Sequence, residues 1–128
     1  MTNIVYDAGV LIAADNGVRR VWAEHAVRLE LGILPLVPSA VLAQASRSPR
    51  QVQLRRLVAG CEVVPLLEAD AHRVGELLAR AKTSDVMDAS VVELAARRAA
   101  DVVTSDPKDI RRLVAAHPGA RAIRVVAV

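Results

Sequence analysis

Short runs of apolar and β-branched residues recur along the chain and predict five β-strands. Each run is rich in Val, Ile or Leu and is bounded by residues that favour turns, mainly Pro, Gly, Asp and Ser. The predicted strands span residues 3–6, 34–38, 61–66, 101–105 and 122–128.

Between these runs, apolar positions recur every three or four residues, a spacing that is typical of amphipathic helices. The predicted helices span residues 8–14, 18–31, 39–58, 69–80, 84–99 and 108–116. We expect Pro49 to break the third helix. Because strands alternate with helices, the strands should pair in parallel through crossover connections. The expected fold class is α/β: a three-layer α/β/α sandwich with a central, mainly parallel sheet.

Length and composition fit a single domain over residues 1–128, since the chain is 53% hydrophobic and 24% charged. The N-terminus has no basic stretch, and Asp7 interrupts its apolar run, so we expect no secretory signal. The longest uncharged apolar run, residues 31–43, is broken by Pro35 and Pro38 and is shorter than the roughly 18 to 20 residues of a membrane span. We therefore expect a cytoplasmic protein outside the membrane.

The formal net charge is +3, and all basic residues except Lys82 and Lys108 are arginines. This mild bias favours a polyanionic partner, although abundant arginine is equally consistent with genomic base composition. The only aromatic residues are Tyr6 and Trp22, which disfavours modules that stack RNA bases on aromatic platforms. Any nucleic acid is expected to be held by its backbone.

Two aspartates come directly after predicted strands. Asp7 follows "NIVY" and Asp106 follows "DVVTS". The carboxyl ends of parallel strands share one edge of the sheet, where binding sites form. Asp106 is also a good helix start because proline follows it, and Asp109 would then lie at the third helical position, where an acid suits the helix dipole. For Asp7, a capping role and a functional role both remain open.

Asp88 lies on the apolar stripe of its predicted helix. The other members of this stripe are Val91, Val92, Ala95 and Ala99. A buried carboxylate is costly unless it is neutralised, paired or bound to a cation, and the sequence has no Lys or Arg three or four positions away. Asp85, one turn earlier, can be explained by the helix dipole alone. Asp88 is therefore the more specific functional candidate.

These aspartates predict a metal site. Asp7, Asp88 and Asp106 should meet at one sheet edge, with Asp85 or Asp109 nearby, and a hard divalent cation relieves the repulsion between such carboxylates. Oxygen ligands favour Mg²⁺ or Mn²⁺ over Zn²⁺. The sequence has one cysteine, expected to be a small buried residue that begins a strand, and three widely spaced histidines, expected to be structural or on the surface. These residues are Cys61, His25, His72 and His117.

Four segments, in this order and spacing, resemble a known family: "IVYDAGVLIA", "VPSAVLAQ", "SDVMDASVV" and "VVTSDPKDI". Together they resemble the PIN-domain ribonucleases, and most closely the VapC toxins of bacterial toxin–antitoxin pairs. The resemblance covers nearly the whole chain. It implies a PIN-like fold, metal-dependent cleavage of RNA, a homodimer and inhibition by a cognate antitoxin protein.

The resemblance also implies roles for individual residues. The catalytic and metal-binding aspartates of the family correspond to Asp7, Asp88 and Asp106. Accessory positions, which include two further acids and a hydroxyl beside the last aspartate, correspond to Asp85, Asp109, Thr104 and Ser105.

Gln44 departs from the family pattern, because a glutamate usually follows "VLA" in this helix. A carboxamide oxygen can ligate Mg²⁺ but carries no charge and accepts no proton. We therefore expect weaker metal binding and reduced activity. Glu24 or Glu30 could substitute, but nothing in the sequence brings them to the site.

The leading hypothesis is a Mg²⁺- or Mn²⁺-dependent endoribonuclease that acts as a toxin. Four arginines flanking the Gln44 helix either bind the RNA backbone or form a solvated helical face; they are Arg47, Arg50, Arg55 and Arg56. The alternative is a PIN fold that binds RNA or an antitoxin without efficient cleavage. A receiver-like phosphoacceptor domain is disfavoured, because "CEVVPL" and "AIRVVAV" lack the aspartate and the lysine that it needs at strand ends.

Overall fold

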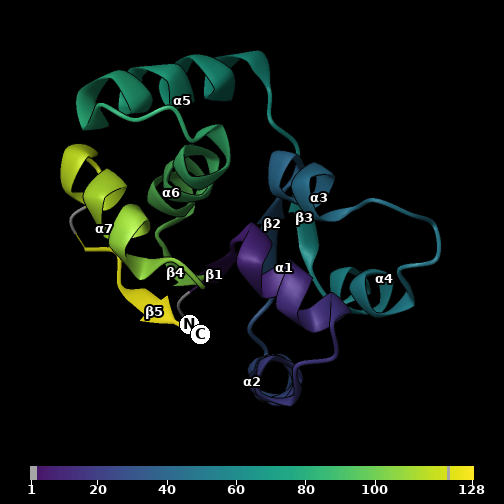
Figure 1. The fold of residues 1–128 in the computed structure, drawn as a ribbon. Helices are drawn as coiled ribbons and strands as arrows, with labels where there is room; N and C mark the ends of the chain where they lie inside the picture. Colours follow the sequence, from purple (N-terminus) through teal and green to yellow (C-terminus); the bar gives the residue numbers. More distant parts are fainter. Residues whose placement is uncertain (1–2, 121) are drawn as a thin grey trace.

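The sheet at the centre of the fold has five strands. The structure is a computed structural model that describes residues 3–120 and 122–128 (Figure 1). Its strands are β1 (Asn3–Tyr6), β2 (Pro35–Pro38), β3 (Glu62–Val64), β4 (Ala100–Thr104) and β5 (Val125–Ala127). All neighbouring strands pair in parallel, in the order β3-β2-β1-β4-β5.

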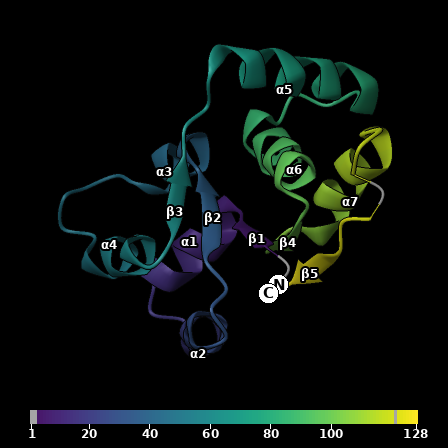
Figure 2. The ribbon, with the colours of Figure 1, turned by 180° about the vertical axis from the view of Figure 1, so that it is seen from behind.

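Helices cover both faces of this sheet. Within the described residues they are α1 (Ala8–Asp15), α2 (Arg19–Glu30), α3 (Ser39–Ala45), α4 (Val52–Ala59), α5 (Glu68–Ala81), α6 (Val86–Arg98) and α7 (Pro107–Ala116). Figures 1 and 2 show α5, α6 and α7 gathered on one side of the molecule and the first four helices on the other. On one face α6 packs against β1, β2 and β4, while α1 and α3 pack against strands on the other face. The α/β/α sandwich predicted from the alternating pattern is confirmed, and its sheet is fully parallel.

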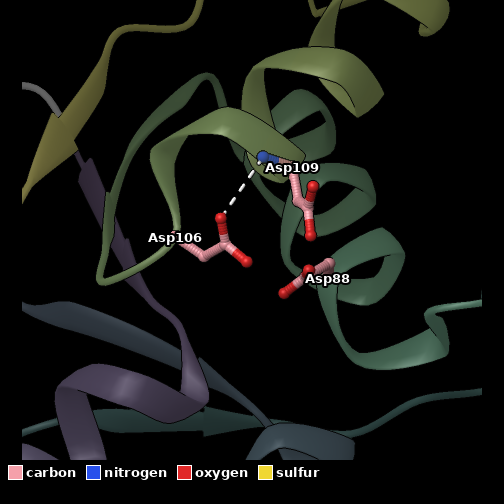
Figure 3. Close-up of side chains that lie close together, drawn as sticks. All are labelled: Asp88, Asp106 and Asp109. Atoms are coloured by element: carbon pink, nitrogen blue, oxygen red, sulfur yellow. Dashed lines mark hydrogen bonds between the residues drawn. The ribbon is translucent and has the colours of Figure 1, made fainter.

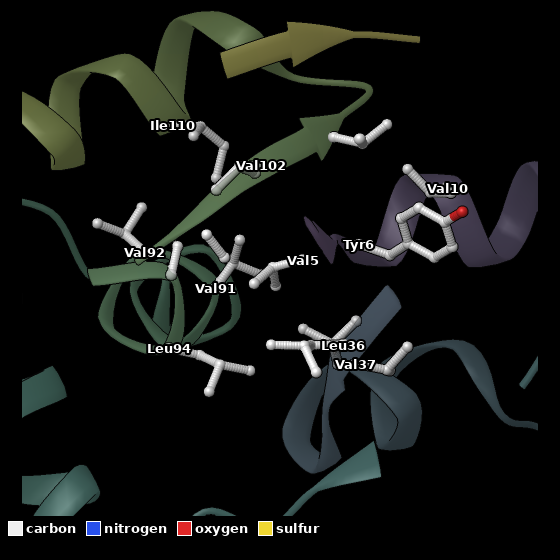
Figure 4. Close-up of a cluster of buried hydrophobic side chains, with 14 of the residues drawn as sticks. Val5, Tyr6, Val10, Leu36, Val37, Val91, Val92, Leu94, Val102 and Ile110 are labelled. Atoms are coloured by element: carbon white, nitrogen blue, oxygen red, sulfur yellow. The ribbon is translucent and has the colours of Figure 1, made fainter. Parts of the chain in front are cut away.

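The core lies where α6 meets the central strands. All five residues of β4 are buried, as a strand covered on both faces requires. Figure 4 shows side chains from β1, β2, β4 and α6 packed together, among them Val5, Leu36, Val91 and Val102. Burying one such side chain contributes about 1.5 to 3 kcal/mol.

The predicted helix over residues 39–58 is broken more widely than Pro49 alone requires, because α3 ends at Ala45 and α4 begins at Val52. The side chain of Gln51 organises the intervening loop. Its Oε1 accepts hydrogen bonds from the backbone N–H groups of Arg47 (2.6 Å) and Ser48 (2.9 Å), and its Nε2 donates to a carboxylate oxygen of Asp15 on α1 (3.0 Å). The loop therefore has its own polar anchor, which helical periodicity does not reveal.

The two edge strands are shorter than predicted, since residues 61–66 reduce to β3 and residues 122–128 to β5. An edge strand has one neighbour and less buried surface, and Pro65 has no N–H group to continue the ladder. Cys61 precedes β3 and is partly buried; burial raises the pKa of its thiol to about 12. Among the described residues, no helix is both long and apolar enough to cross a bilayer.

Candidate metal centre

Strands β1 and β4 lie side by side at the centre of the sheet, and the chain leaves them for opposite faces. Loops that diverge in this way open a crevice at the carboxyl ends of the strands. Asp7 directly follows β1, and Asp106 follows β4 after a single residue. The first turn of α6 reaches the same edge, because a crossover helix runs antiparallel to the strands that it connects. Three remote segments thus meet there.

Three carboxylates form a cluster at this edge, which we call the acidic cluster: Asp88, Asp106 and Asp109. Each offers an oxygen within 4.8 Å of the others, and Figure 3 shows Asp88 on α6 facing Asp106 and Asp109 at the start of α7. Asp106 caps α7, with its Oδ1 accepting from the backbone N–H of Asp109 at 3.5 Å. Asp109 is therefore the third residue of α7, as predicted, and it lies within the cluster rather than beside it.

Asp85 is the N-cap of α6 rather than a residue within the helix. Its Oδ1 accepts a hydrogen bond from the backbone N–H of Asp88 at 3.0 Å. Asp88 is the third helical residue and is partly buried. The apolar stripe below it is buried as far as Ala95, whereas Ala99 is exposed and ends the helix with a left-handed backbone conformation (φ 51°). The predicted stripe was therefore one turn too long.

The electrostatics of the edge favour uptake of positive charge. The pKa of Asp88 is raised to about 7, first by burial, then by the charge and hydrogen bonding of Asp85, and further by the charges of Asp7 and Asp106. The hydrogen bond and charge of Asp106 also raise the pKa of Asp109. Either a proton or a metal cation relieves such repulsion, so the two compete for the site.

Asp7 lies at the same edge but is held by the protein. Its side chain is only 3% exposed. One carboxylate oxygen accepts from the N–H of Val10 (3.0 Å), and the other accepts from the N–H of Ser105 (3.2 Å) and the hydroxyl of Thr104. Burial raises the pKa of Asp7, partly offset by these hydrogen bonds. The capping role left open by the sequence is therefore real, while metal ligation by Asp7 stays a prediction.

Thr104 connects the aspartates at the ends of the two central strands. Its hydroxyl donates to the carboxylate of Asp7 and accepts a hydrogen bond from the backbone N–H of Asp106 at 2.8 Å. It is fully buried, whereas Ser105 is exposed. Of the two hydroxyl residues considered from the sequence, Thr104 makes the contact between the aspartates with its side chain.

Gly9 is a residue of this edge that the sequence analysis missed. A Cβ atom at Gly9 would lie 1.7 Å from Oγ and 2.7 Å from Cβ of Ser105. Only glycine therefore lets the first turn of α1 approach the loop after β4. A glycine in the first turn of a helix is a weak signal of such a close approach.

Gln44 is exposed on α3, a helix that packs against α1 and α6. The glutamates considered as substitutes lie on α2 and do not belong to the acidic cluster. Glu24 pairs with Arg20 (2.9 Å) and Arg28 (3.6 Å), and Glu30 ends the helix in an exposed position.

The four arginines considered for RNA binding are all exposed. Arg47 donates to the carbonyl oxygens of Ala43 (2.7 Å) and Ser46 (2.9 Å), so it caps the end of α3. Arg55 donates to the carbonyl oxygen of Pro49, and Arg56 lies over the ring of Trp22 at 5.8 Å. Arg50 carries the fourth guanidinium. Contact of these four residues with RNA stays a prediction.

The histidines have structural surroundings or lie on the surface, as expected. His25 is buried and hydrogen-bonded to the hydroxyl of Tyr6 at 2.9 Å. His117 lies 2.7 Å from a carboxylate oxygen of Glu93, and His72 is exposed.

The acidic cluster fits a hard divalent cation. Its donors are carboxylate oxygens, which such cations prefer, and it contains neither sulfur nor imidazole. The three oxygens lie within 4.8 Å of one another, so a single ion can be within reach of all of them. The positive dipole ends of α6 and α7 also lie beside these carboxylates, and they stabilise the negative charge of the ionised groups.

Comparisons with known proteins concern the family and the fold of the chain. The family model described as "PIN domain" matches residues 4–115. Among solved structures, the chain is similar to the crystal structure of VapBC2 from Rickettsia felis bound to a DNA fragment from their promoter. That similarity has a TM-score of 0.72 and covers 99% of each chain at 16% sequence identity. The curated proteins contain no match.

Proposed function

The chain belongs to the PIN-domain family, and from this premise we propose that it is a Mg²⁺- or Mn²⁺-dependent endoribonuclease, the toxin of a toxin–antitoxin pair. The acidic cluster is the observation that carries the proposal, since it gathers three carboxylates from the starts of α6 and α7 at a sheet edge. A nuclease that uses a metal needs such oxygen donors and no covalent nucleophile.

Each side chain at the edge has a role in the proposed reaction. Asp88, Asp106 and Asp109 would hold the cation, and Asp7, the further ligand expected from the sequence, would add its charge at the same edge. When bound, the cation supplies Lewis acidity that polarises the phosphodiester towards attack by water. Thr104 orients Asp7 and the start of α7 through its two hydrogen bonds. The carboxyl group of Asp88 must lose its proton to bind the cation, and because its pKa is raised to about 7, a proton competes with the cation near neutral pH.

The partners follow from the family and from the charge of the chain. RNA is the proposed substrate, and the exposed arginines around residues 46–56 are proposed to contact its backbone. A cognate antitoxin is supported by the fold that the chain shares with VapBC2. A cytoplasmic homodimer is proposed on the family resemblance alone.

Replacing Asp88 with Asn tests the assignment, because it removes one anionic ligand and nearly keeps the shape of the side chain. RNA cleavage is measured with Mg²⁺, with Mn²⁺ and with EDTA. We expect a loss of about 100-fold or more, because the loss of a residue that only supports a metal ligand already costs about 10- to 100-fold. Glu76→Gln, an exposed acid on α5, is the matched control and should cleave like the parent. Cleavage by Asp88→Asn at the parental rate refutes the assignment.

A second candidate function is binding of RNA or an antitoxin without efficient cleavage. This function is favoured by Gln44 on α3, the helix that packs against α1 and α6, because its side chain carries no charge where the family usually has a glutamate. Gln44→Glu distinguishes the two functions. A large gain in cleavage and in Mg²⁺ affinity indicates a weakened native site. No gain indicates that the native site is already competent or that position 44 does not correspond to the family glutamate.

The antitoxin proposal has its own test. The chain is purified alone and together with the small protein encoded by the adjacent reading frame, and RNA cleavage is measured for both preparations. A stable complex with suppressed cleavage supports the toxin role. If the neighbouring protein neither binds nor inhibits, the toxin role is abandoned and the nuclease proposal stands separately.

A further inference from the structure

Arg112 on α7 reaches across to the end of α5. Its Nε donates to the carbonyl oxygen of Ala81 at 3.1 Å, and its Nη2 donates to the carbonyl oxygen of Lys82 at 3.3 Å. The last carbonyls of a helix have no partner within the helix, and a cation suits the negative end of the helix dipole. The forked guanidinium of Arg112 satisfies two such groups at once.

The segment that Arg112 holds leads directly into α6. Lys82 has a left-handed backbone conformation (φ 56°, ψ 48°), which is strained for a residue other than glycine and needs support from its surroundings. After it the chain has only Thr83 and Ser84 before Asp85 caps α6. The position of this turn therefore determines where α6 starts, and with it the position of Asp88.

Arg112 also belongs to the helix that carries the other two acids. Asp106 caps α7, and Asp109 lies one helical turn before Arg112, on the same face. One side chain thus joins the helix of Asp106 and Asp109 to the turn that precedes Asp88. Hydrogen bonds that connect two such elements fix the distance between the metal ligands that the elements carry.

We propose that Arg112 is a positioning residue that sets the separation of Asp88 from Asp106 and Asp109 across the acidic cluster. The inference rests on the proposed function for its role in cation binding. A positioning role and a simple effect of charge predict opposite changes in metal affinity when Arg112 is removed. Removing a cation beside carboxylates strengthens their attraction for a metal ion, whereas loss of positioning weakens metal binding.

The experiment compares Arg112→Ala and Arg112→Lys with Arg111→Ala, an exposed arginine at the neighbouring position of α7. The dissociation constant of Mn²⁺ is measured by calorimetry, well below the unfolding temperature of every variant. We expect Arg112→Ala to weaken binding about tenfold. Arg112→Lys keeps the charge but lacks the fork, so we expect most of the loss to remain. Arg111→Ala, which removes the same charge, should bind as tightly as the parent or more tightly.

Hydrogen exchange supplies a readout that does not need the metal. The backbone N–H groups of Asp88 and Ala89 bond to Asp85 at the start of α6. We expect both to exchange faster in Arg112→Ala than in the parent, with no change in Arg111→Ala. If Arg112→Ala does not fold, Arg112→Lys is used for both measurements.

The outcomes separate this inference from the proposed function. Suppose that the parent binds Mn²⁺. If Arg112→Ala then binds it as tightly as the parent or more tightly, the positioning role is overturned, whatever the exchange rates are. If the parent binds no Mn²⁺, the proposed metal site fails. Hydrogen exchange then decides whether Arg112 positions α6, and unchanged exchange rejects that as well.

Discussion

At the start of α6, Asp88 carries a carboxyl group whose pKa is raised to about 7, well above the usual range of an aspartate. Burial contributes most, and three neighbouring aspartates add to the shift. Asp88 therefore responds both to pH and to cations, because a bound proton and a bound cation each relieve the repulsion between these carboxylates.

The first prediction concerns the pH dependence of cation binding. The carboxylate of Asp88 must be free of its proton to ligate, so Mn²⁺ affinity should rise with pH and level off above the pKa. Between about pH 8 and pH 6 the affinity should fall, approaching tenfold per unit below the midpoint. Calorimetric titration over this range measures the midpoint.

Asp85→Asn provides the matching control for this prediction. Asparagine still caps a helix but has no charge, so the variant loses a major cause of the shift at Asp88. The midpoint should move to lower pH. A midpoint that stays near 7 in Asp85→Asn would contradict the coupling of the two carboxyl groups. Glu76→Gln, which changes a distant acid, should leave the midpoint unchanged.

Gly9 gives a prediction about stability. In Gly9→Ala the new Cβ overlaps Ser105, so the start of α1 or the loop after β4 must move, which costs about 1 to 3 kcal/mol. Urea denaturation measures the loss. Gly75→Ala is the control, since nothing lies within 4 Å of its added Cβ and a helix interior gains about 0.5 to 1 kcal/mol from the change. Equal stability of Gly9→Ala and the parent would mean that the close approach is not needed.

Among the helices, α5 is joined to α6 by charged side chains at a partly buried surface. Asp70 on α5 is 4% exposed and accepts hydrogen bonds from Arg73 (2.7 Å) and from Arg97 on α6 (2.9 Å). Arg73 also pairs with Glu93 of α6 at 3.0 Å, and Glu93 in turn contacts His117. This network and the hydrogen bonds of Arg112 to Ala81 and Lys82 connect α5, α6 and α7, so we expect these three helices to move together.

A prediction at this scale follows from Asp70. In Asp70→Asn the charge is lost while Arg73 and Arg97 remain, so we expect the free energy of unfolding to fall by about 2 kcal/mol, the range of a hydrogen bond to a charged group. Chemical denaturation measures it. Glu68, in the same turn of α5, pairs with His72 at an exposed position, and Glu68→Gln should change stability by less than about 0.5 kcal/mol. Similar effects of the two changes would argue against the network.

For the whole molecule, the strand order decides where the acids meet. Because β1 and β4 are neighbours, residues 97 positions apart, Asp7 and Thr104, share a hydrogen bond. The connections from β3 through α5 and α6 to β4 then bring Asp88 to the same edge. The acidic cluster concentrates negative charge at this edge, and the repulsion within it is relieved by a bound cation or by protons.

The last prediction therefore concerns global stability. At a Mn²⁺ concentration about 100 times the dissociation constant, binding to the folded state should add about 2.7 kcal/mol to the free energy of unfolding. Asp88→Asn should remove this gain. Without metal at pH 8, the same variant should be more stable than the parent, because one repelling charge is gone. Thermal unfolding with and without Mn²⁺ checks both signs, and a variant that is less stable without metal would contradict the repulsion.

Much of the fold was predictable because its signals are local. Short, nearly continuous apolar runs identify β4 and its neighbours, since a buried parallel strand must be apolar on both faces. Proline after Asp106 marks the start of α7 without any tertiary information. The edges of the sheet were less predictable, because the lengths of β3 and β5 depend on how much of each segment finds a partner.

By itself, the sequence determined the order of the elements and which aspartates stand at the ends of strands and helices, because periodicity and capping depend on neighbours along the chain. Only the tertiary structure decided which oxygens meet. It joined Asp109 to Asp88 and Asp106, held Asp7 with Thr104, and brought Gly9 against Ser105. Such distances depend on strand order and helix packing, and no local pattern encodes the separation of atoms from remote segments.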